Sequence, residues 1–279
     1  MRKTRCNVCF RHCELREGQT GPCGARKGAD GKVVPVWYGR ISSLALDPIE
    51  KKPLARFHPG SRILSVGSLG CNLRCPFCQN HEIAQAEGNR FPVRTESLFP
   101  EELAELAVVY RPQGNIGVAF TYNEPLVGWE YVRDTAKLVH AKHMVNVLVT
   151  NGCAEAEILR EILPYTDAMN IDLKGFTDRY YTEVLGGDRQ MVMDFIREAV
   201  KHCHVELTTL VVPGENDSEE EMLRLSGWVA GLSEEIPLHI SRFFPRHRMT
   251  DREPTDIRKA YALVATARKN LRYVYPGNC

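Results

Sequence analysis

The chain has 279 residues, 43% of them hydrophobic, which is enough for one large α/β domain and a small addition. Its 36 basic and 35 acidic residues leave a formal charge of +1, so charge gives no reason to expect nucleic acid or a membrane surface as a partner. The first residues are polar, and no run approaches the length of a membrane span. We therefore expect a cytoplasmic protein.

Ten cysteines are present, and seven of them fall into two tight groups at spacings typical of metal ligands. A chain of this size does not need disulfides to stabilise its core, so reduced, metal-binding thiols are the better interpretation. Cys153 and Cys203 lie in or beside predicted regular elements and are interpreted as small core residues.

The first group is Cys6-x2-Cys9-x3-Cys13-x9-Cys23. Four thiolates are enough for either a second iron-sulfur cluster or a closed structural zinc site, and the spacing leaves both open. Residues 1–60, which contain this group, are rich in Cys, Gly and Arg and show little periodicity. They are predicted to form a metal-binding extension that wraps or extends a main domain at 61–279.

The main domain alternates β-branched runs with amphipathic stretches, which is typical of strand-helix units around a parallel sheet. Six such units favour a partial (β/α)6 barrel over a closed eight-fold one. The predicted strands are Arg62–Val66, Ile116–Thr121, Val145–Thr150, Ala168–Asp172, Val205–Val212, Leu238–Ser241 and Leu271–Tyr275. The predicted helices are Pro100–Tyr110, Gly128–Lys142, Ala154–Leu163, Gln190–His202, Ser218–Leu232 and Thr255–Asn270, with Pro100, Ser218 and Thr255 as helix-start residues.

Polar residues follow nearly every predicted strand. Each alone is best explained as a helix cap or a turn. Because ligands bind at the carboxyl ends of the strands in parallel α/β folds, the set together indicates a binding site. The set comprises Thr121–Pro125, Thr150–Gly152, Asp172 with Lys174, Pro213–Asp217, and His239 within the sixth strand.

The second cysteine group, Cys71-x3-Cys75-x2-Cys78, directly follows the first strand of the main domain. Three thiols at this spacing can hold three corners of a cubane cluster and leave one iron open to a small molecule. The alternative is half of a zinc site that a distant ligand completes.

These blocks, in this order, resemble the pyruvate formate-lyase activating enzyme group of the radical S-adenosylmethionine (SAM) superfamily, and most closely the AmmeMemoRadiSam system enzymes. The resemblance covers nearly the whole chain, through DPIEKKPL, GCNLRCPFCQN, TYNEP, VTNG, NIDLKGF, VVPGEND and HISRFFP. It implies a TIM-like partial barrel in which Cys71, Cys75 and Cys78 bind a [4Fe-4S] cluster. It also implies SAM contacts from Glu124, Thr150, Asn151, Asp172, Lys174, Val211, Val212 and His239.

The activity that the resemblance implies is reductive cleavage of SAM to a 5′-deoxyadenosyl radical that abstracts a hydrogen atom. The first hypothesis is a glycyl-radical-enzyme activase with a protein substrate and a flavodoxin or ferredoxin as electron donor. The alternatives are modification of a small molecule or of another protein residue, and a non-catalytic metal-binding scaffold. The basic loop Arg242–Arg252 follows the sixth strand and either binds an acidic substrate or is a solvated loop.

Overall fold

One eight-stranded sheet organises the protein, and its strand order is β14-β13-β12-β11-β10-β9-β7-β6. The computed structural model describes residues 3–85 and 91–279. The strands are β1 Thr4–Arg5, β2 Glu14–Leu15, β3 Arg26–Ala29, β4 Lys32–Pro35, β5 Arg40–Ile41, β6 Ser43–Pro48, β7 Arg62–Gly67, β8 Glu96–Ser97, β9 Asn115–Phe120, β10 Val145–Thr150, β11 Ala168–Asp172, β12 His204–Val211, β13 Leu238–Arg242 and β14 Val274–Gly277. The helices are α1 His81–Ala84, α2 Pro100–Val109, α3 Trp129–Ala141, α4 Ala156–Ile162, α5 Arg189–Ala199, α6 Glu219–Ala230 and α7 Ile257–Ala267, with a π-helix at Tyr180–Leu185.

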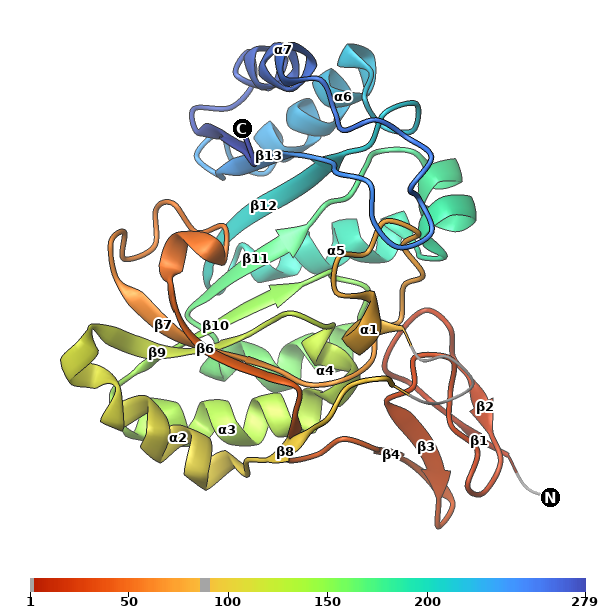
Figure 1. Ribbon diagram of the computed structural model, residues 1–279, viewed down its shortest axis with the longest axis vertical. Coiled ribbons are helices and arrows are strands. Elements are labelled where there is room, and N and C mark those ends of the chain that lie inside the picture. Colours follow the sequence, from red (N-terminus) through yellow and green to blue (C-terminus); the bar gives the residue numbers. More distant parts are fainter. Residues whose placement is uncertain (1–2, 86–90) are drawn as a thin grey trace.

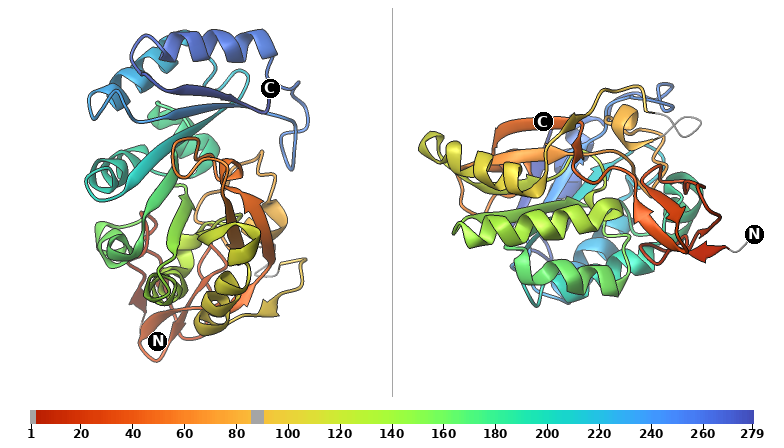
Figure 2. Two further views of the ribbon diagram at one scale, coloured as in Figure 1. Left: turned by 90° about the vertical axis from the view of Figure 1, so that its left-hand side faces the viewer. Right: turned by 90° about the horizontal axis from the view of Figure 1, so that it is seen from below.

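Strands β7 and β9–β14 pair in parallel, each joined to its neighbour through a connection that carries a helix. The helices α2–α7 cover one face of the curved sheet, and the other face is turned inward (Figures 1 and 2). Within the described residues, no pairing joins the edge strands β14 and β6. The predicted partial (β/α)6 barrel is therefore confirmed.

Side-chain caps set the starts of α5, α6 and α7. Helix α6 begins after Ser218, whose hydroxyl accepts a hydrogen bond from the Glu221 N–H at 3.1 Å, as predicted. The start of α7 differs from the prediction, because Asp256 and not Thr255 caps this helix. The Thr255 hydroxyl instead donates to the Val211 carbonyl at 2.6 Å. The same hydroxyl accepts from the Phe243 N–H, just after β13, at 2.9 Å. Thr255 therefore ties the end of β13 to β12, and the helix starts two residues later.

Strand β6 is a part of the sheet that the sequence analysis did not predict. It pairs antiparallel with β7 over its whole length, from Ser43 opposite Gly67 to Pro48 opposite Arg62. As an edge strand it is only partly buried, which explains why its hydrophobic pattern is weak. The sheet therefore crosses the predicted boundary at residue 60.

The segment that follows β6, residues 49–61, is here called the floor segment, because it closes the barrel near the amino-terminal ends of the strands. The Asn170 side chain of β11 donates to the Pro53 carbonyl at 2.8 Å. The Ala55 and Arg56 N–H groups donate to the Glu206 carboxylate of β12 at 2.9 and 2.7 Å. The floor segment also contributes to a small buried apolar cluster, whose members are Ile49, Leu54, Ile63, Ala119, Val147 and Ala168.

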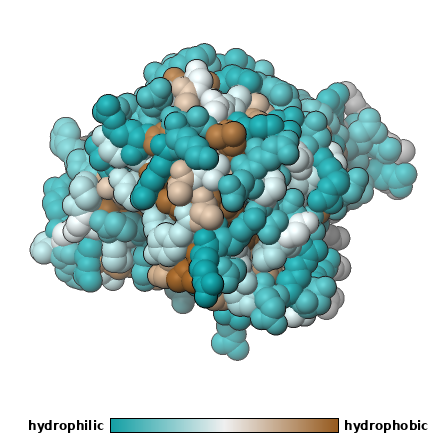
Figure 3. Space-filling model, turned by 90° about the horizontal axis from the view of Figure 1, so that it is seen from above, coloured by the Kyte–Doolittle hydropathy of each residue, from teal (hydrophilic) through white to brown (hydrophobic). Residues whose placement is uncertain are grey.

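Three short antiparallel pairs, β1–β2, β3–β4 and β5–β8, make up the rest of the strands. The first two lie beside the barrel near the N-terminus (Figure 1). Seen from above, the surface is mainly hydrophilic, with small hydrophobic groups between polar side chains (Figure 3). Among the described residues, none of the helices has the length and apolarity needed to cross a membrane.

Candidate functional site

A cavity of about 800 Å³ occupies the barrel, and its wall includes residues at the carboxyl ends of β9, β10 and β11. This is the place where parallel α/β barrels bind their ligands. Eight of the predicted site residues line it: Cys71, Cys75, Cys78, Glu124, Thr150, Asn151, Asp172 and Lys174.

The loop after β7 presents the three cysteines to this cavity. It is held by backbone hydrogen bonds to other parts of the chain, among them Arg74 N–H to the Leu185 carbonyl at 2.7 Å. Cys75 is buried, and Cys71 and Cys78 are partly exposed. The π-helix Tyr180–Leu185 therefore serves as a support for the cysteine loop, a role that the sequence analysis did not predict.

The chemistry of these thiols fits a metal cluster. Burial raises the pKa of the Cys75 thiol to about 11 and also raises the pKa values of Cys71 and Cys78. Their thiolates therefore need nearby positive charge, which the iron ions of a cluster supply. The Cys71 sulfur also receives hydrogen bonds from the Leu73 N–H at 3.4 Å and the Asn151 amide at 3.6 Å. Three thiolates fill three corners of a cubane and leave the fourth iron for another ligand.

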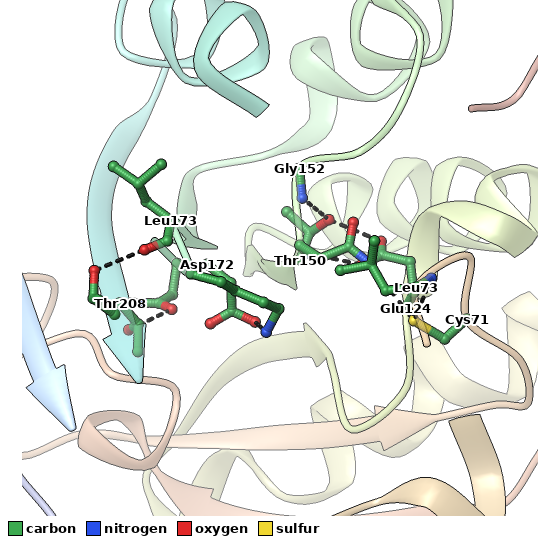
Figure 4. A network of polar contacts seen from close by, with 12 residues as sticks. Cys71, Leu73, Glu124, Thr150, Gly152, Asp172, Leu173 and Thr208 are labelled. Carbon is green, nitrogen blue, oxygen red and sulfur yellow. Dashed lines mark hydrogen bonds and ion pairs between the residues drawn. The ribbon is translucent and has the colours of Figure 1, made fainter. Parts of the chain in front are cut away.

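Glu124 follows β9 and is almost completely buried beside the cysteine loop (Figure 4). Its carboxylate accepts hydrogen bonds from the Leu126 N–H at 3.0 Å, the Thr150 hydroxyl at 2.8 Å and the Asn151 N–H at 2.8 Å. Burial nevertheless raises its pKa to about 7. A carboxylate has about four acceptor positions. One position therefore remains for a further donor such as an ammonium group.

Thr150 and Asn151, at the end of β10, connect Glu124 to the cysteine loop. Besides its contact with Cys71, the Asn151 amide donates to the Asn72 side chain at 2.9 Å. Asn72 in turn donates to the Cys153 carbonyl at 2.7 Å. The carboxylate and the cysteines are thus held in one hydrogen-bonded network.

Asp172 lies across the cavity from this network (Figure 4), and it forms an ion pair with Lys174 at 2.8 Å. Burial lowers the pKa of Lys174, but the Asp172 carboxylate outweighs that effect and holds the pKa well above its ordinary value. The Asn216 side chain fixes the Lys174 backbone through a 2.6 Å hydrogen bond to its carbonyl. Lys174 therefore keeps its positive charge at the cavity wall.

Three predicted SAM contacts lie apart from this group. Val211 and Val212 are fully buried in the main hydrophobic core at the end of β12. His239 sits at the beginning of β13, with its Nε2 2.7 Å from a carboxylate oxygen of Glu206. The structure thus places His239 beside the floor segment and not beside the cysteines, and a contact of these three residues with SAM stays a prediction.

The N-terminal cysteines also come together. Cys6, Cys9, Cys13 and Cys23 line one small second cavity. Burial raises the pKa of Cys9 to about 11 and raises those of Cys13 and Cys23. Cys6, Cys9 and Cys23 are buried and Cys13 is partly exposed, and a metal at these four thiols stays a prediction.

Sequence reasoning gave no role to Asp47 and Lys52, and it named Tyr122 only as a member of the set Thr121–Pro125. The Tyr122 hydroxyl donates to Asp47 at 2.7 Å, and the Lys52 ammonium lies 2.9 Å from the same carboxylate. Asp47 and Lys52 belong to the DPIEKKPL block and Tyr122 to TYNEP. Both blocks were therefore recognised in the sequence, but no local sequence pattern indicated that they contact each other in the fold.

A family model described as the radical SAM superfamily matches residues 65–226, which span the sheet from β7 to β12 and part of α6. The chain belongs to the radical SAM superfamily. Among its relatives, the protein MJ0808 of Methanocaldococcus jannaschii is 40% identical over 279 residues, covering 99% of this chain and 81% of the relative. The pyruvate formate-lyase 1-activating enzyme of Escherichia coli K12 is 27% identical over 173 residues, covering 60% of this chain and 68% of the enzyme.

Solved structures agree with this radical SAM fold. A domain of pyruvate-formate lyase-activating enzyme from Bacteroides vulgatus superposes with a TM-score of 0.51 at 18% identity, covering 58% of this chain and 99% of the domain. Streptococcus suis SuiB bound to S-adenosylmethionine superposes with a TM-score of 0.60 at 13% identity, over 78% of this chain and 52% of SuiB. At these identities the likeness concerns the fold alone.

Proposed function

We propose that this radical SAM protein cleaves SAM at a [4Fe-4S] cluster held by Cys71, Cys75 and Cys78. The observation that carries the proposal is the network that joins the Cys71 sulfur, through Asn151, to the buried Glu124 carboxylate on the wall of one cavity. When bound and reduced, the cluster supplies the electron that splits SAM into methionine and a 5′-deoxyadenosyl radical, which then abstracts a hydrogen atom from the substrate.

The residues of the chain position SAM for this reaction. Glu124 would accept a hydrogen bond from the SAM amino group, which suits a carboxylate whose fourth acceptor position is open. Lys174 would offset the charge of the SAM carboxylate. The barrel wall encloses the reacting groups and limits the access of water.

For the substrate we propose a protein, with the chain acting as a glycyl-radical-enzyme activase that receives electrons from a flavodoxin or ferredoxin in the cytoplasm. Relatives with the names of activating enzymes support this, including that of Clostridium pasteurianum at 27% identity over 179 residues. We further propose a second metal, zinc or an iron-sulfur cluster, at Cys6, Cys9, Cys13 and Cys23.

Chromatographic detection of 5′-deoxyadenosine tests the activity. The protein is reconstituted anaerobically with iron and sulfide, mixed with SAM and reduced, and Cys75→Ala is compared with Cys203→Ala, a cysteine outside the cavity. Product from the wild type and Cys203→Ala, but not from Cys75→Ala, is the expected result. A protein that holds its full cluster and forms no product contradicts the proposal.

The activase role needs a separate measurement. Incubation with a glycyl radical enzyme should produce a glycine-centred radical visible by electron paramagnetic resonance, and the signal should be absent with Cys75→Ala. Turnover of a small molecule without a protein radical would favour the alternative substrate class.

A further inference from the structure

We infer that the part of the cavity beside the floor segment binds an anionic group of the substrate, a carboxylate or a phosphate, through Lys51 and Lys52. The inference rests on the proposed function and names the substrate class for that same cavity. Three features carry it: one carboxylate shared by two lysines, a strained tyrosine that holds the arrangement, and an excess of positive charge around the cavity.

The two lysines stand at the start of the floor segment and both line the cavity. Lys52 Nζ lies 2.9 Å from one Asp47 oxygen, and Lys51 Nζ lies 3.3 Å from the other. One carboxylate therefore neutralises only one of two ammonium groups. The Lys51 side chain is 67% exposed and the Lys52 side chain 3% exposed, so one ammonium is adaptable and the other is held in place.

Tyr122 holds this arrangement through contacts with both Asp47 and Lys52. Its hydroxyl donates to Asp47 at 2.7 Å, and Lys52 Nζ lies 4.7 Å from the centre of its ring. The Tyr122 backbone has a φ of 72°, in the left-handed region that a bulky residue rarely adopts. Strain of this kind persists where the surrounding contacts demand it, and it gathers at functional sites.

The rim of the cavity adds further positive charge through Arg242 and Arg246. The Arg242 guanidinium donates to the Thr255 carbonyl at 2.8 Å. Within residues 3–85 and 91–279, neither arginine forms an ion pair with a carboxylate. This agrees with the interpretation that the basic loop binds an acidic substrate.

The predicted cofactors do not neutralise the excess of positive charge around the cavity. Among the described residues, five basic side chains line the cavity, those of Lys51, Lys52, Lys174, Arg242 and Arg246. The carboxylates that oppose them are Glu124 and Asp172 on the wall and Asp47 beside the two lysines, so positive charge remains in excess. SAM carries one net positive charge, and an oxidised [4Fe-4S] cluster with three thiolates carries one negative charge, so together they add nothing. The remaining positive charge favours an anion in this cavity, where the protein wall excludes part of the solvent. The substrate is therefore the component that brings the negative charge.

Isothermal titration of the reconstituted protein with SAM tests this. The probes are succinate, glycerol 3-phosphate and the neutral butane-1,4-diol. We expect at least one anion to bind and the diol not to bind, and we expect Lys51→Met to weaken the anion roughly tenfold. Lys201→Met removes an exposed lysine of the outer surface and should leave binding unchanged. Binding of succinate alone would identify a carboxylate, and binding of glycerol 3-phosphate alone a phosphate.

A second variant guards against misfolding, because Lys52→Met alone would remove the buried partner of Asp47 and leave this carboxylate only the exposed Lys51. In Asp47→Asn/Lys52→Met both charges are removed, and anion binding should again weaken. The inference is wrong if neither anion binds, or if both variants bind as tightly as the wild type. The titration does not depend on SAM cleavage, so its failure is distinct from a failure to form 5′-deoxyadenosine.

Discussion

The Cys71 N–H donates a hydrogen bond to the Cys23 carbonyl at 3.3 Å. The first cysteine of the cluster loop thus contacts the last cysteine of the N-terminal group directly. Arg11 of the N-terminal segment reinforces this link, because its side chain donates to the Asn72 carbonyl at 2.8 Å. The two cysteine groups, 48 residues apart at their nearest members in the sequence, therefore form adjoining sites.

Loss of the N-terminal metal should consequently affect the cluster loop. We expect Cys6→Ser/Cys9→Ser to lose the metal of the N-terminal group, to lower the stability by on the order of several kcal/mol, and to reduce iron retention at Cys71, Cys75 and Cys78. Elemental analysis for iron and zinc measures the first effect and identifies the metal. Unchanged metal content in the variant would show that the N-terminal cysteines do not bind metal.

Glu124→Gln should weaken SAM binding by roughly tenfold or more, because a neutral amide replaces the acceptor of a charge-assisted hydrogen bond. The pKa of Glu124 is about 7, so wild-type affinity should fall as the pH decreases from 8 to 6 and the carboxylate is protonated. Equilibrium binding of SAM to the reconstituted protein measures both effects. Glu105→Gln, on the surface, is the control, and equal pH profiles for Glu124→Gln and the wild type would contradict the assignment.

Glu206 should make stability depend on pH in acid. Burial raises its pKa, but hydrogen bonds from His204, His239 and two floor-segment N–H groups outweigh burial and lower the pKa from 4.5 to about 2. The stabilisation is complete above about pH 4.5 and is lost as the pH falls toward 2, because only the unfolded chain binds the proton in that window. It amounts to about 3 kcal/mol.

Denaturant unfolding of wild type and Glu206→Gln measures this contribution. The variant should be about 3 kcal/mol less stable at pH 7, and the gap should narrow on acidification. Loss of clusters in acid is common to both proteins and cancels in the difference. A gap that stays constant down to pH 2 would rule out the Glu206 contribution. Glu157→Gln, on an exposed face of α4, should have the same stability as the wild type.

Arg26→Met should detach the N-terminal strands from the barrel. The buried Arg26 guanidinium lies 2.6 Å from a Glu130 oxygen of α3 and also donates to the Val33 carbonyl at 2.9 Å. Removing one partner of a buried ion pair costs about 3–5 kcal/mol. Limited proteolysis should then cut within residues 3–40. The exposed pair of Arg160 with Glu157 is the comparison, and Arg160→Met should change the stability by less than about 1 kcal/mol.

Much of the barrel was predictable because its signals are local. The predicted strands at Val145–Thr150 and Ala168–Asp172 match β10 and β11, since a buried β-branched run between helices has few other solutions. The last strand was predicted at Leu271–Tyr275, and β14 begins three residues later. Leu271 is instead buried directly after α7, where its N–H donates to Ala267.

The cysteine loop, the alternation of strands and helices, and the polar residues at the strand ends could all be predicted, because each is a pattern of neighbouring residues. That β6 joins the sheet and that the floor segment closes the barrel became evident only in the folded chain. Folding alone brought Asp47 to Tyr122, Ala55 to Glu206 and Cys23 to Cys71. These contacts join residues 48 to 151 positions apart, and no local periodicity encodes which distant carboxylate or carbonyl a side chain will meet once the sheet has curved.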